Sequence, residues 1–150
     1  MKRSLIAAVV VCASATFASA QAIAPADVKI EDMEVAQSLT GVPGDAANGR
    51  KVFANRKKGN CLACHANADM SEMLFHGEIG PPLDGVAERY EEPFLRALLV
   101  NAKEVFPDTI MPAFYVDPST LNRVAAKFEG KTILTAQEVE DVIAYLLTLK

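Results

Sequence analysis

The apolar positions of this chain recur at helical spacing more often than they alternate. The clearest segment is 135–147, whose apolar residues fall on one face of a helix: Val139, Val142, Ile143, Leu146 and Leu147. Thr135 and Glu138 have the spacing of a capping box, and Leu134 stands where it can form a hydrophobic staple with Val139. This pattern predicts an amphipathic helix at the C-terminal end.

A second helix is expected to begin at Asp45 as its N-cap and to end near Lys57. Val52 and Phe53 lie on one face of it together with Gly49. A glycine inside a helix costs about 1 kcal/mol relative to alanine. A close approach by another helix would explain why glycine stands there.

Two helices are expected in between. Pro93 suits the first turn of one, with an apolar stripe of Phe94, Leu95, Leu98 and Leu99. Asp117-Pro118 is expected to open a shorter one, which Gly130 would end and whose stripe is Leu121, Val124, Ala125 and Phe128. Few segments alternate as strands do, so the predicted fold class is all-α.

The first twenty residues have the pattern of a secretory signal peptide. Lys2 and Arg3 precede an apolar run over 5–17, and Ala18-Ser19-Ala20 is an A-x-A cleavage site. An uncleaved membrane anchor is the alternative interpretation. We therefore expect a periplasmic mature chain that begins at about Gln21 and, with no second apolar segment of spanning length, makes no membrane contact.

The mature chain is expected to hold one domain, 45–150, preceded by an extension, 21–44, that is disordered at first and then lies against the domain. The formal net charge is −4 and becomes more negative when Lys2 and Arg3 are removed. Such a chain has no electrostatic footprint for nucleic acid. Its partners should be proteins or small molecules.

Cys61 and Cys64 lie in the stretch GNCLACH, and three chemistries could use them. A zinc site needs four ligands, which Cys61, Cys64, His65 and His76 barely supply, and the adjacent Cys64 and His65 aim poorly at one tetrahedral centre. A thiol redox pair would normally sit in a βαβ setting, which this sequence lacks.

The third chemistry is covalent haem. C-x-x-C-H is the attachment signature of haem c, in which each thiol bonds to one vinyl group. His65, directly after Cys64, would then lie beneath the iron as its proximal ligand. This interpretation uses every group of the motif, so we predict one haem c on Cys61 and Cys64.

A low-spin electron-transfer haem needs a sixth iron ligand. The candidates are Met33, Met70, Met73, His76 and Met111. Met111 is favoured because it stands in a loop, PDTIMPAF, where Pro112 restricts its backbone. A methionine that only fills the core is more typical of the apolar stripe of a helix. His76 is the alternative. A thioether would raise the reduction potential relative to a second histidine.

A proline-rich turn lies between the two ligand segments, in IGPPLDG over 79–85. Pro81 lies in this turn, which could offer a backbone carbonyl to His65 Nδ1–H, orient the ring and make it a better ligand. An ordinary proline and glycine loop is the alternative.

These motifs together resemble those of the class I cytochromes c. The resemblance covers about 45–150 and implies a fold in which the first and last helices cross around one haem, with Gly49, Phe53 and Tyr145 at the crossing. A narrower resemblance, to the SoxX family of monohaem subunits, rests on TGVPGDAANGRKVF, GNCLACH, GEIGPPLDGVAERY, MPAFY and LTAQEVEDVIAYLLTL.

The narrower resemblance implies an electron-transfer subunit of a SoxAX complex, which joins thiosulfate to a cysteine of the SoxYZ carrier. The chain would pair with a SoxA-type cytochrome subunit, accept its electrons and pass them to a downstream cytochrome. No catalytic residue is expected in this chain. The alternatives are a free periplasmic electron carrier and a haem catalyst or gas sensor, and the last requires an open iron position.

Overall fold

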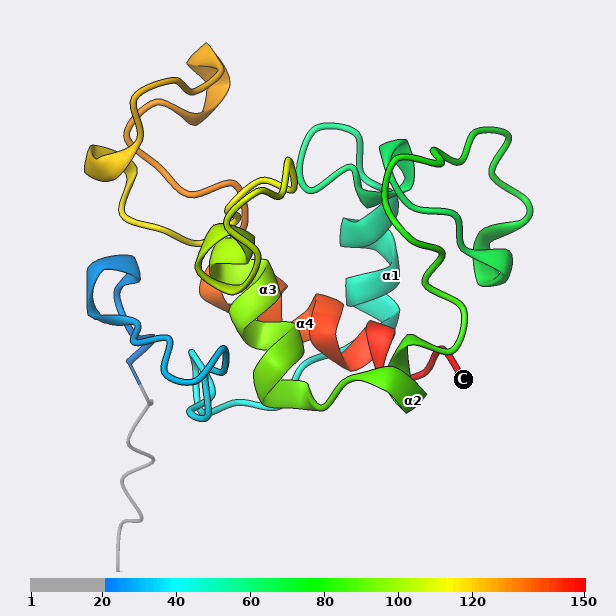
Figure 1. Ribbon diagram of the computed structural model, residues 1–150, viewed down its shortest axis with the longest axis horizontal. Coiled ribbons are helices and arrows are strands. Elements are labelled where there is room, and N and C mark those ends of the chain that lie inside the picture. Colours follow the sequence, from blue (N-terminus) through cyan, green and yellow to red (C-terminus); the bar gives the residue numbers. More distant parts are fainter. Residues whose placement is uncertain (1–20) are drawn as a thin grey trace, which may run out of the picture.

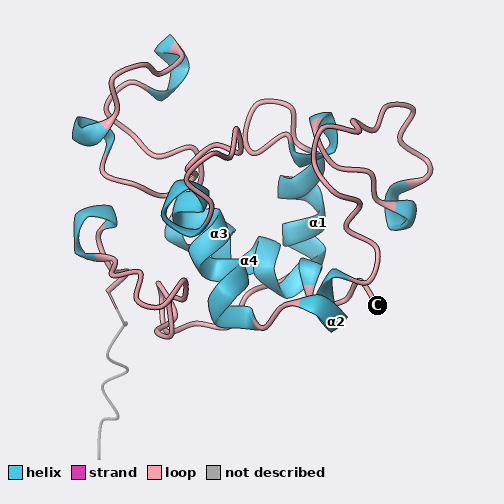
Figure 2. Cartoon of the chain, viewed as in Figure 1, coloured by secondary structure: helices cyan, strands magenta, loops and turns pink. Residues whose placement is uncertain are grey.

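The computed structural model describes residues 21–150, so the expected signal peptide, 1–20, lies outside the described residues. Within them the chain forms four α-helices: α1 (Ala46–Ala54), α2 (Val86–Arg89), α3 (Glu92–Val105) and α4 (Ala136–Leu146) (Figure 1). Figure 2 shows the long loops that join them and no strand in this part of the chain. The all-α prediction is confirmed. No described helix is both long enough and apolar enough to cross a membrane.

The core is organised by the crossing of α1 and α4, which come from opposite ends of the domain (Figure 1). At the crossing a Cβ atom on Gly49 would lie 1.9 Å from the carbonyl oxygen of Asp141, so only glycine permits this approach. The rings of Phe53 and Tyr145 meet edge to face beside it, with centroids 5.6 Å apart. The expected crossing of the first and last helices is confirmed.

The helix ends follow their capping residues. Asp45 accepts hydrogen bonds from the N–H groups of Ala47 and Asn48, and Thr135 and Glu138 form the expected capping box on α4. α1 ends at Ala54, three residues before the expected end. The reason is Asn55, whose extended backbone ends the helix and whose side chain accepts the N–H of Lys57.

α3 contains a kink that places the loop after it. Asn101 has φ −152° and ψ 91°, outside the helical region. The carbonyls of Leu99 and Val100 therefore face other partners, and they accept the N–H groups of Phe114 and Tyr115. Phe114 and Tyr115 are both buried, so the segment that follows Met111 is fixed to α3.

The expected helix after Asp117-Pro118 is wrong. Residues 117–131 form an irregular arm with two single 3-10 turns, Pro118–Thr120 and Ala126–Phe128. Leu121 and Val124, which the helix would have turned toward a core, are 37% and 36% exposed. A short amphipathic helix is stable only when its apolar face packs against something, and this arm extends away from the domain.

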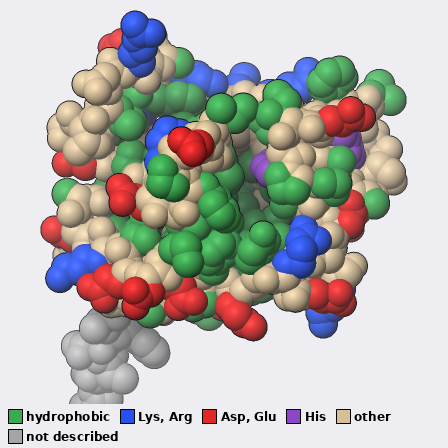
Figure 3. All heavy atoms as spheres, viewed as in Figure 1, with side chains coloured by type: hydrophobic (Ala, Val, Ile, Leu, Met, Phe, Trp, Pro, Cys, Tyr) green, Lys and Arg blue, Asp and Glu red, His purple; other side chains and the backbone are tan. Residues whose placement is uncertain are grey.

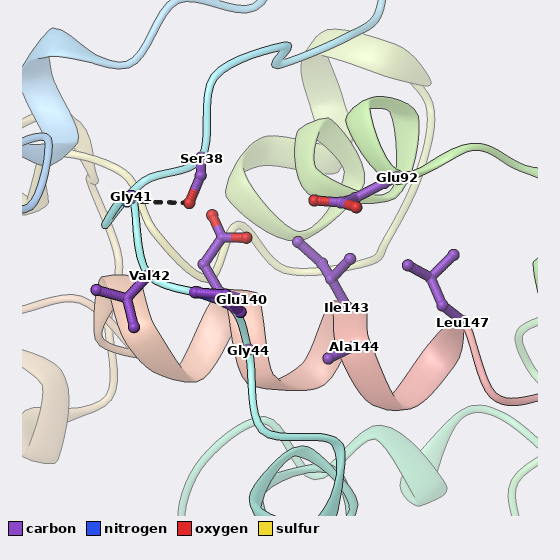
Figure 4. Close-up of a pocket in the computed structure, with 10 residues that line it drawn as sticks. Ser38, Gly41, Val42, Gly44, Glu92, Glu140, Ile143, Ala144 and Leu147 are labelled. Carbon is purple, nitrogen blue, oxygen red and sulfur yellow. Dashed lines mark hydrogen bonds between the residues drawn. The ribbon is translucent and has the colours of Figure 1, made fainter.

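The extension 21–44 lies on α3 and α4, and its first residues already make defined contacts. The N–H of Ile23 donates to Leu39 O, and the Tyr115 hydroxyl donates to Ile23 O, so the expectation of disorder at its start is wrong. Val35 and Leu39 are buried in the core. Figure 4 shows the cavity between this extension and α4, with Ser38 accepting the N–H of Gly41 above Glu140.

A buried ion pair fastens the extension. Arg96 of α3 and Glu140 of α4 are 2% and 4% exposed, and Arg96 Nε donates to Glu140 Oε1 over 2.9 Å. The same two side chains hold the extension, because Arg96 donates to Val35 O and Glu140 accepts the N–H of Leu39. Every polar group of the pair is used, which such burial requires.

Candidate haem site

The two cysteines stand on a tight turn that follows α1. Asn60 adopts a left-handed backbone with φ 51°, after which Cys61–Ala63 form one 3-10 turn. The N–H groups of Cys64 and His65 both donate to Cys61 O, at 3.1 and 3.0 Å. Cys61 and Cys64 are not joined to each other. The turn therefore leaves both thiols available at adjacent positions for a bridging group.

The structure argues against the two competing chemistries. Among the described residues no group of three or more His, Cys, Asp or Glu side chains is placed to hold a metal ion, which a zinc site would need. Burial raises the pKa of the Cys61 thiol to about 12, and thiol exchange needs a thiolate.

His65 is held from two sides. Its Nδ1 lies 2.8 Å from the carbonyl oxygen of Pro81, the contact expected of the proline-rich turn. Gly80 packs against the ring, where a Cβ atom would come within 2.4 Å of Cε1. The turn is itself tied to the cysteines, since the N–H of Gly80 donates to Cys64 O. With Nδ1 engaged, Nε2 is the nitrogen that can bind iron.

Met111 lies on a separate loop whose backbone is held by polar contacts. Its N–H donates to the Thr109 hydroxyl, and Lys103 Nζ donates to the carbonyls of Thr109 and Met111. This loop, yellow in Figure 1, faces the Cys61–Ala63 turn across the space between α3 and α1. In the same view Figure 3 shows a hollow there, lined by apolar side chains and bordered by a histidine.

The other candidate ligands are occupied elsewhere. His76 accepts the N–H of Asn67 at Nδ1, and its Nε2 lies 3.1 Å from Met70 O, so both ring nitrogens serve the loop itself. Met70 is 1% exposed within the core, and Met33 is 51% exposed on the extension. Met73 and Met111 both pack at the edge of the core. Met111 differs because it stands on a loop apart from the cysteine segment, with its backbone held by Thr109 and Lys103, so it stays the favoured candidate.

Sequence reasoning missed a polar network behind the motif. The buried Asn67 donates from Nδ2 to the Tyr145 hydroxyl, which donates to Asp69, and Asp69 accepts from Arg50 of α1. The hydrogen bond from Arg50 and, to a smaller extent, the one from Tyr145 lower the pKa of Asp69. Tyr145, placed within the apolar face of α4, was the available sequence signal, because a buried tyrosine hydroxyl needs a partner.

These residues fit a covalently bound haem. The cysteine turn, the His65 ring and Gly80 lie together, because Pro81 O contacts His65 Nδ1 and the N–H of Gly80 donates to Cys64 O, and the loop that carries Met111 faces this turn in Figure 1. When bound, haem iron supplies one-electron chemistry by alternating between its ferric and ferrous states. The cavity of Figure 4 is a different place, because its lining contains none of the five expected site residues.

Comparisons with known proteins agree with this geometry. A family model described as cytochrome c matches residues 46–150. Seven chains of solved structures match, and one belongs to the crystal structure of SoxXA from P. pantotrophus. That chain is 41% identical, the alignment covers 87% of this chain and 99% of that one, and the TM-score is 0.79. Among curated proteins, none matches.

The family match covers residues 46–150, which include the attachment motif. The solved SoxXA chain shares the fold over 99% of its own length. The cofactor is therefore haem c, covalently bound, and the protein is an electron-transfer protein. The chain belongs to the cytochrome c family, and within that family it is a SoxX-type cytochrome.

Proposed function

We propose that this chain is the monohaem electron-transfer subunit of a SoxAX complex that oxidises thiosulfate. The observation that carries the proposal is the 41% identity to a chain of SoxXA from P. pantotrophus, over 99% of that chain. The partner is a SoxA-type cytochrome subunit, and the substrate of the complex is a cysteine of the SoxYZ carrier. The SoxA-type subunit, and not this chain, holds the catalytic site.

The reaction requires an electron acceptor. The cysteine sulfur of SoxYZ and the outer sulfur of thiosulfate form an S–S bond, and this step releases two electrons and the thiol proton. A one-electron carrier next to the catalytic site must take these electrons in two successive transfers. In the proposal this chain does so and passes each electron to a downstream cytochrome.

Each site residue has a defined role in the proposal. Cys61 and Cys64 hold the haem through thioether bonds, and His65 binds iron through Nε2 while Pro81 O holds Nδ1. Met111 would be the second protein ligand of the iron. With two ligands supplied by the chain, the site would suit electron transfer better than oxygen chemistry or gas sensing.

The proposal also places the protein in the periplasm after removal of residues 1–20. Haem attachment through two thioethers keeps Cys61 and Cys64 from pairing in that oxidising compartment. The mass of the protein recovered from the periplasm tests this. A mass equal to residues 21–150 plus one haem supports it, and retention of residues 1–20 contradicts it.

The function is tested by reconstitution with a SoxA-type subunit, SoxYZ and thiosulfate. We expect thiosulfate to reduce the haem of this chain and SoxYZ to gain the mass of one thiosulfate adduct. SoxYZ with its cysteine alkylated is the control and should support neither change. A chain that stays oxidised while SoxYZ is conjugated at full rate contradicts the proposal. If it also fails to bind the SoxA-type subunit, a free carrier becomes the better assignment.

A further inference from the structure

The loop after the attachment motif displays large apolar side chains to solvent. Leu74 is 104% exposed, Phe75 71% and Ile79 68%. We call these three residues the loop patch. Single exposed apolar residues are common on protein surfaces, but three within six positions of one loop are a feature that marks interaction surfaces.

The loop that carries the patch is held rigidly against the attachment turn. The N–H of Gly77 donates to Leu62 O over 2.7 Å, and a Cβ atom on Gly77 would lie 2.0 Å from Ala63 O. His76 fixes the preceding part of the loop, because its ring nitrogens contact the N–H of Asn67 and the carbonyl oxygen of Met70. The backbone at His76 and Gly77 is therefore fixed beside the cysteines, which lowers the cost of ordering this loop when a partner binds there.

A hollow next to the patch gives a partner side chain a place to enter. It has a volume of about 410 Å³, and Leu74 and Phe75 line it together with Leu62 and Ala63, the two residues between the cysteines. Arg56 and Asn60 also line it. A concave apolar centre with polar groups at its edge is the usual composition of a protein interface.

The chemistry of this surface distinguishes between two kinds of redox partner. Encounters with diffusible redox partners have small interfaces, whereas the interfaces of permanent complexes are larger and more apolar. Leu74, Phe75 and Ile79 have no charge, the nearby Glu72 is paired with Arg50, and the exposed Glu78 and Arg56 add one charge of each sign at the edge of this apolar surface. The surface therefore fits a permanent subunit better than a transient acceptor, and the solved relative is itself a chain of a complex, SoxXA.

We propose that the loop patch, Leu74, Phe75 and Ile79, is the surface on which the SoxA-type haem subunit docks permanently. This inference rests on the proposed function and deepens it. Docking there places the partner against the turn that carries the haem cysteines, which shortens the path along which electrons enter this chain. The downstream cytochrome must then use another part of the surface.

The test measures dissociation of the holo-protein from an immobilised SoxA-type subunit in 0.5 M NaCl, where contacts between exposed charges are screened. The patch variant is Leu74→Ser with Phe75→Ser. Its matched control is Leu121→Ser with Val124→Ser, an exposed apolar pair on the 117–131 arm. Haem content and the spectrum of each reduced variant report whether the fold is intact.

We expect the patch variant to dissociate at least about 30-fold faster than the wild type, as loss of a central aromatic anchor does, while the control pair dissociates at the wild-type rate. A patch variant that dissociates within twofold of the wild type overturns the inference and leaves the proposed function standing. Faster release of the control pair alone moves the interface to the arm and also overturns it. If the wild type forms no complex, the proposed function and this inference fall together.

Discussion

Gly80 lies so close to the imidazole of His65 that a Cβ atom at position 80 would stand 2.6 Å from Nδ1 and 2.9 Å from Nε2. The residue after it, Pro81, supplies the carbonyl that Nδ1 contacts. One backbone turn thus sets both the space available to the ring and its hydrogen bond. The orientation of the proposed iron ligand depends on the absence of a side chain at position 80.

We expect Gly80→Ala to disturb this ligand. The added methyl group must push the ring away from Pro81 O, which weakens the hydrogen bond that makes the imidazole a stronger ligand. The variant should contain less haem per chain and show a shifted reduction potential. Gly130→Ala is the control for a general loss of stability: its methyl group meets nothing within 4 Å, but its φ of +69° strains an alanine far from the ring, so it should leave the potential unchanged. Equal potentials for Gly80→Ala and the wild type would contradict this role.

Met111 and His76 can be separated by optical spectroscopy. Ferric haem with a methionine ligand has a weak absorption band at the red end of the visible spectrum. We expect Met111→Ala to abolish this band and to lower the reduction potential, because the thioether favours ferrous iron. His76→Ala should keep the band, since both nitrogens of His76 are engaged within its own loop. A wild-type spectrum without this band, or a band that survives in Met111→Ala, would overturn the assignment of Met111.

Glu140 should contribute strongly to stability. Glu140→Ala leaves the Arg96 guanidinium, 2% exposed, without its buried partner and also removes the acceptor of the Leu39 N–H. Loss of one member of such a pair typically costs about 3–5 kcal/mol in the free energy of unfolding. Denaturant unfolding of the holo-protein measures this, and limited proteolysis should show faster cleavage within 21–44.

A control for this prediction uses the same arginine. Arg96 also pairs with Glu92, whose side chain is 53% exposed. Glu92→Gln should change the free energy of unfolding by no more than about 1 kcal/mol, as for surface ion pairs. If the two substitutions cost the same, the burial of the Arg96–Glu140 pair is not what stabilises the extension.

Asp141 should make the free energy of unfolding decrease at acidic pH. Burial alone raises the pKa of Asp141, but hydrogen bonds from Gln137, Asp45 N–H and Asn48 outweigh it and lower the pKa below its ordinary 3.8. A lowered pKa in the folded state means that this stabilisation is complete above the unfolded pKa. It is lost as the pH falls below 3.8 and through the folded pKa.

Urea unfolding between neutral pH and strongly acidic pH tests this expectation. The wild type should lose stability below about pH 4 at up to about 1.4 kcal/mol per pH unit for this one group. Asp141→Asn should be less stable at neutral pH, but its free energy of unfolding should fall less steeply as the pH drops below about 4. Asp108→Asn, at an exposed position, should follow the wild-type curve. If the free energy of unfolding of Asp141→Asn falls with acid as steeply as that of the wild type, Asp141 is not a source of the acid dependence.

The local sequence determined much of this protein. The capping box of α4, the N-cap at Asp45 and the apolar face of α4 could be predicted because each depends on residues a few positions apart. The C-x-x-C-H motif pointed to haem c for the same reason, since its geometry is set within one turn. Gly49 could be identified as a close approach because glycine is costly in a helix unless a neighbour needs the space.

Other features depended on contacts between distant segments. The stripe at Leu121, Val124, Ala125 and Phe128 has helical spacing, yet it forms no helix, because no surface of the domain lies opposite it to bury its apolar face. The extension looked irregular in sequence but is ordered, because Arg96 and Glu140, far away along the chain, hold its backbone.

The same division applies to the site. Residue types and short spacings were enough to predict which residues could attach haem and bind iron. Contacts that form only on folding engage His76 in its own loop, bring Pro81 O to His65 and place the loop patch beside the cysteines. Each of these features is a contact between segments that are separated in the sequence. Local sequence patterns do not specify such contacts.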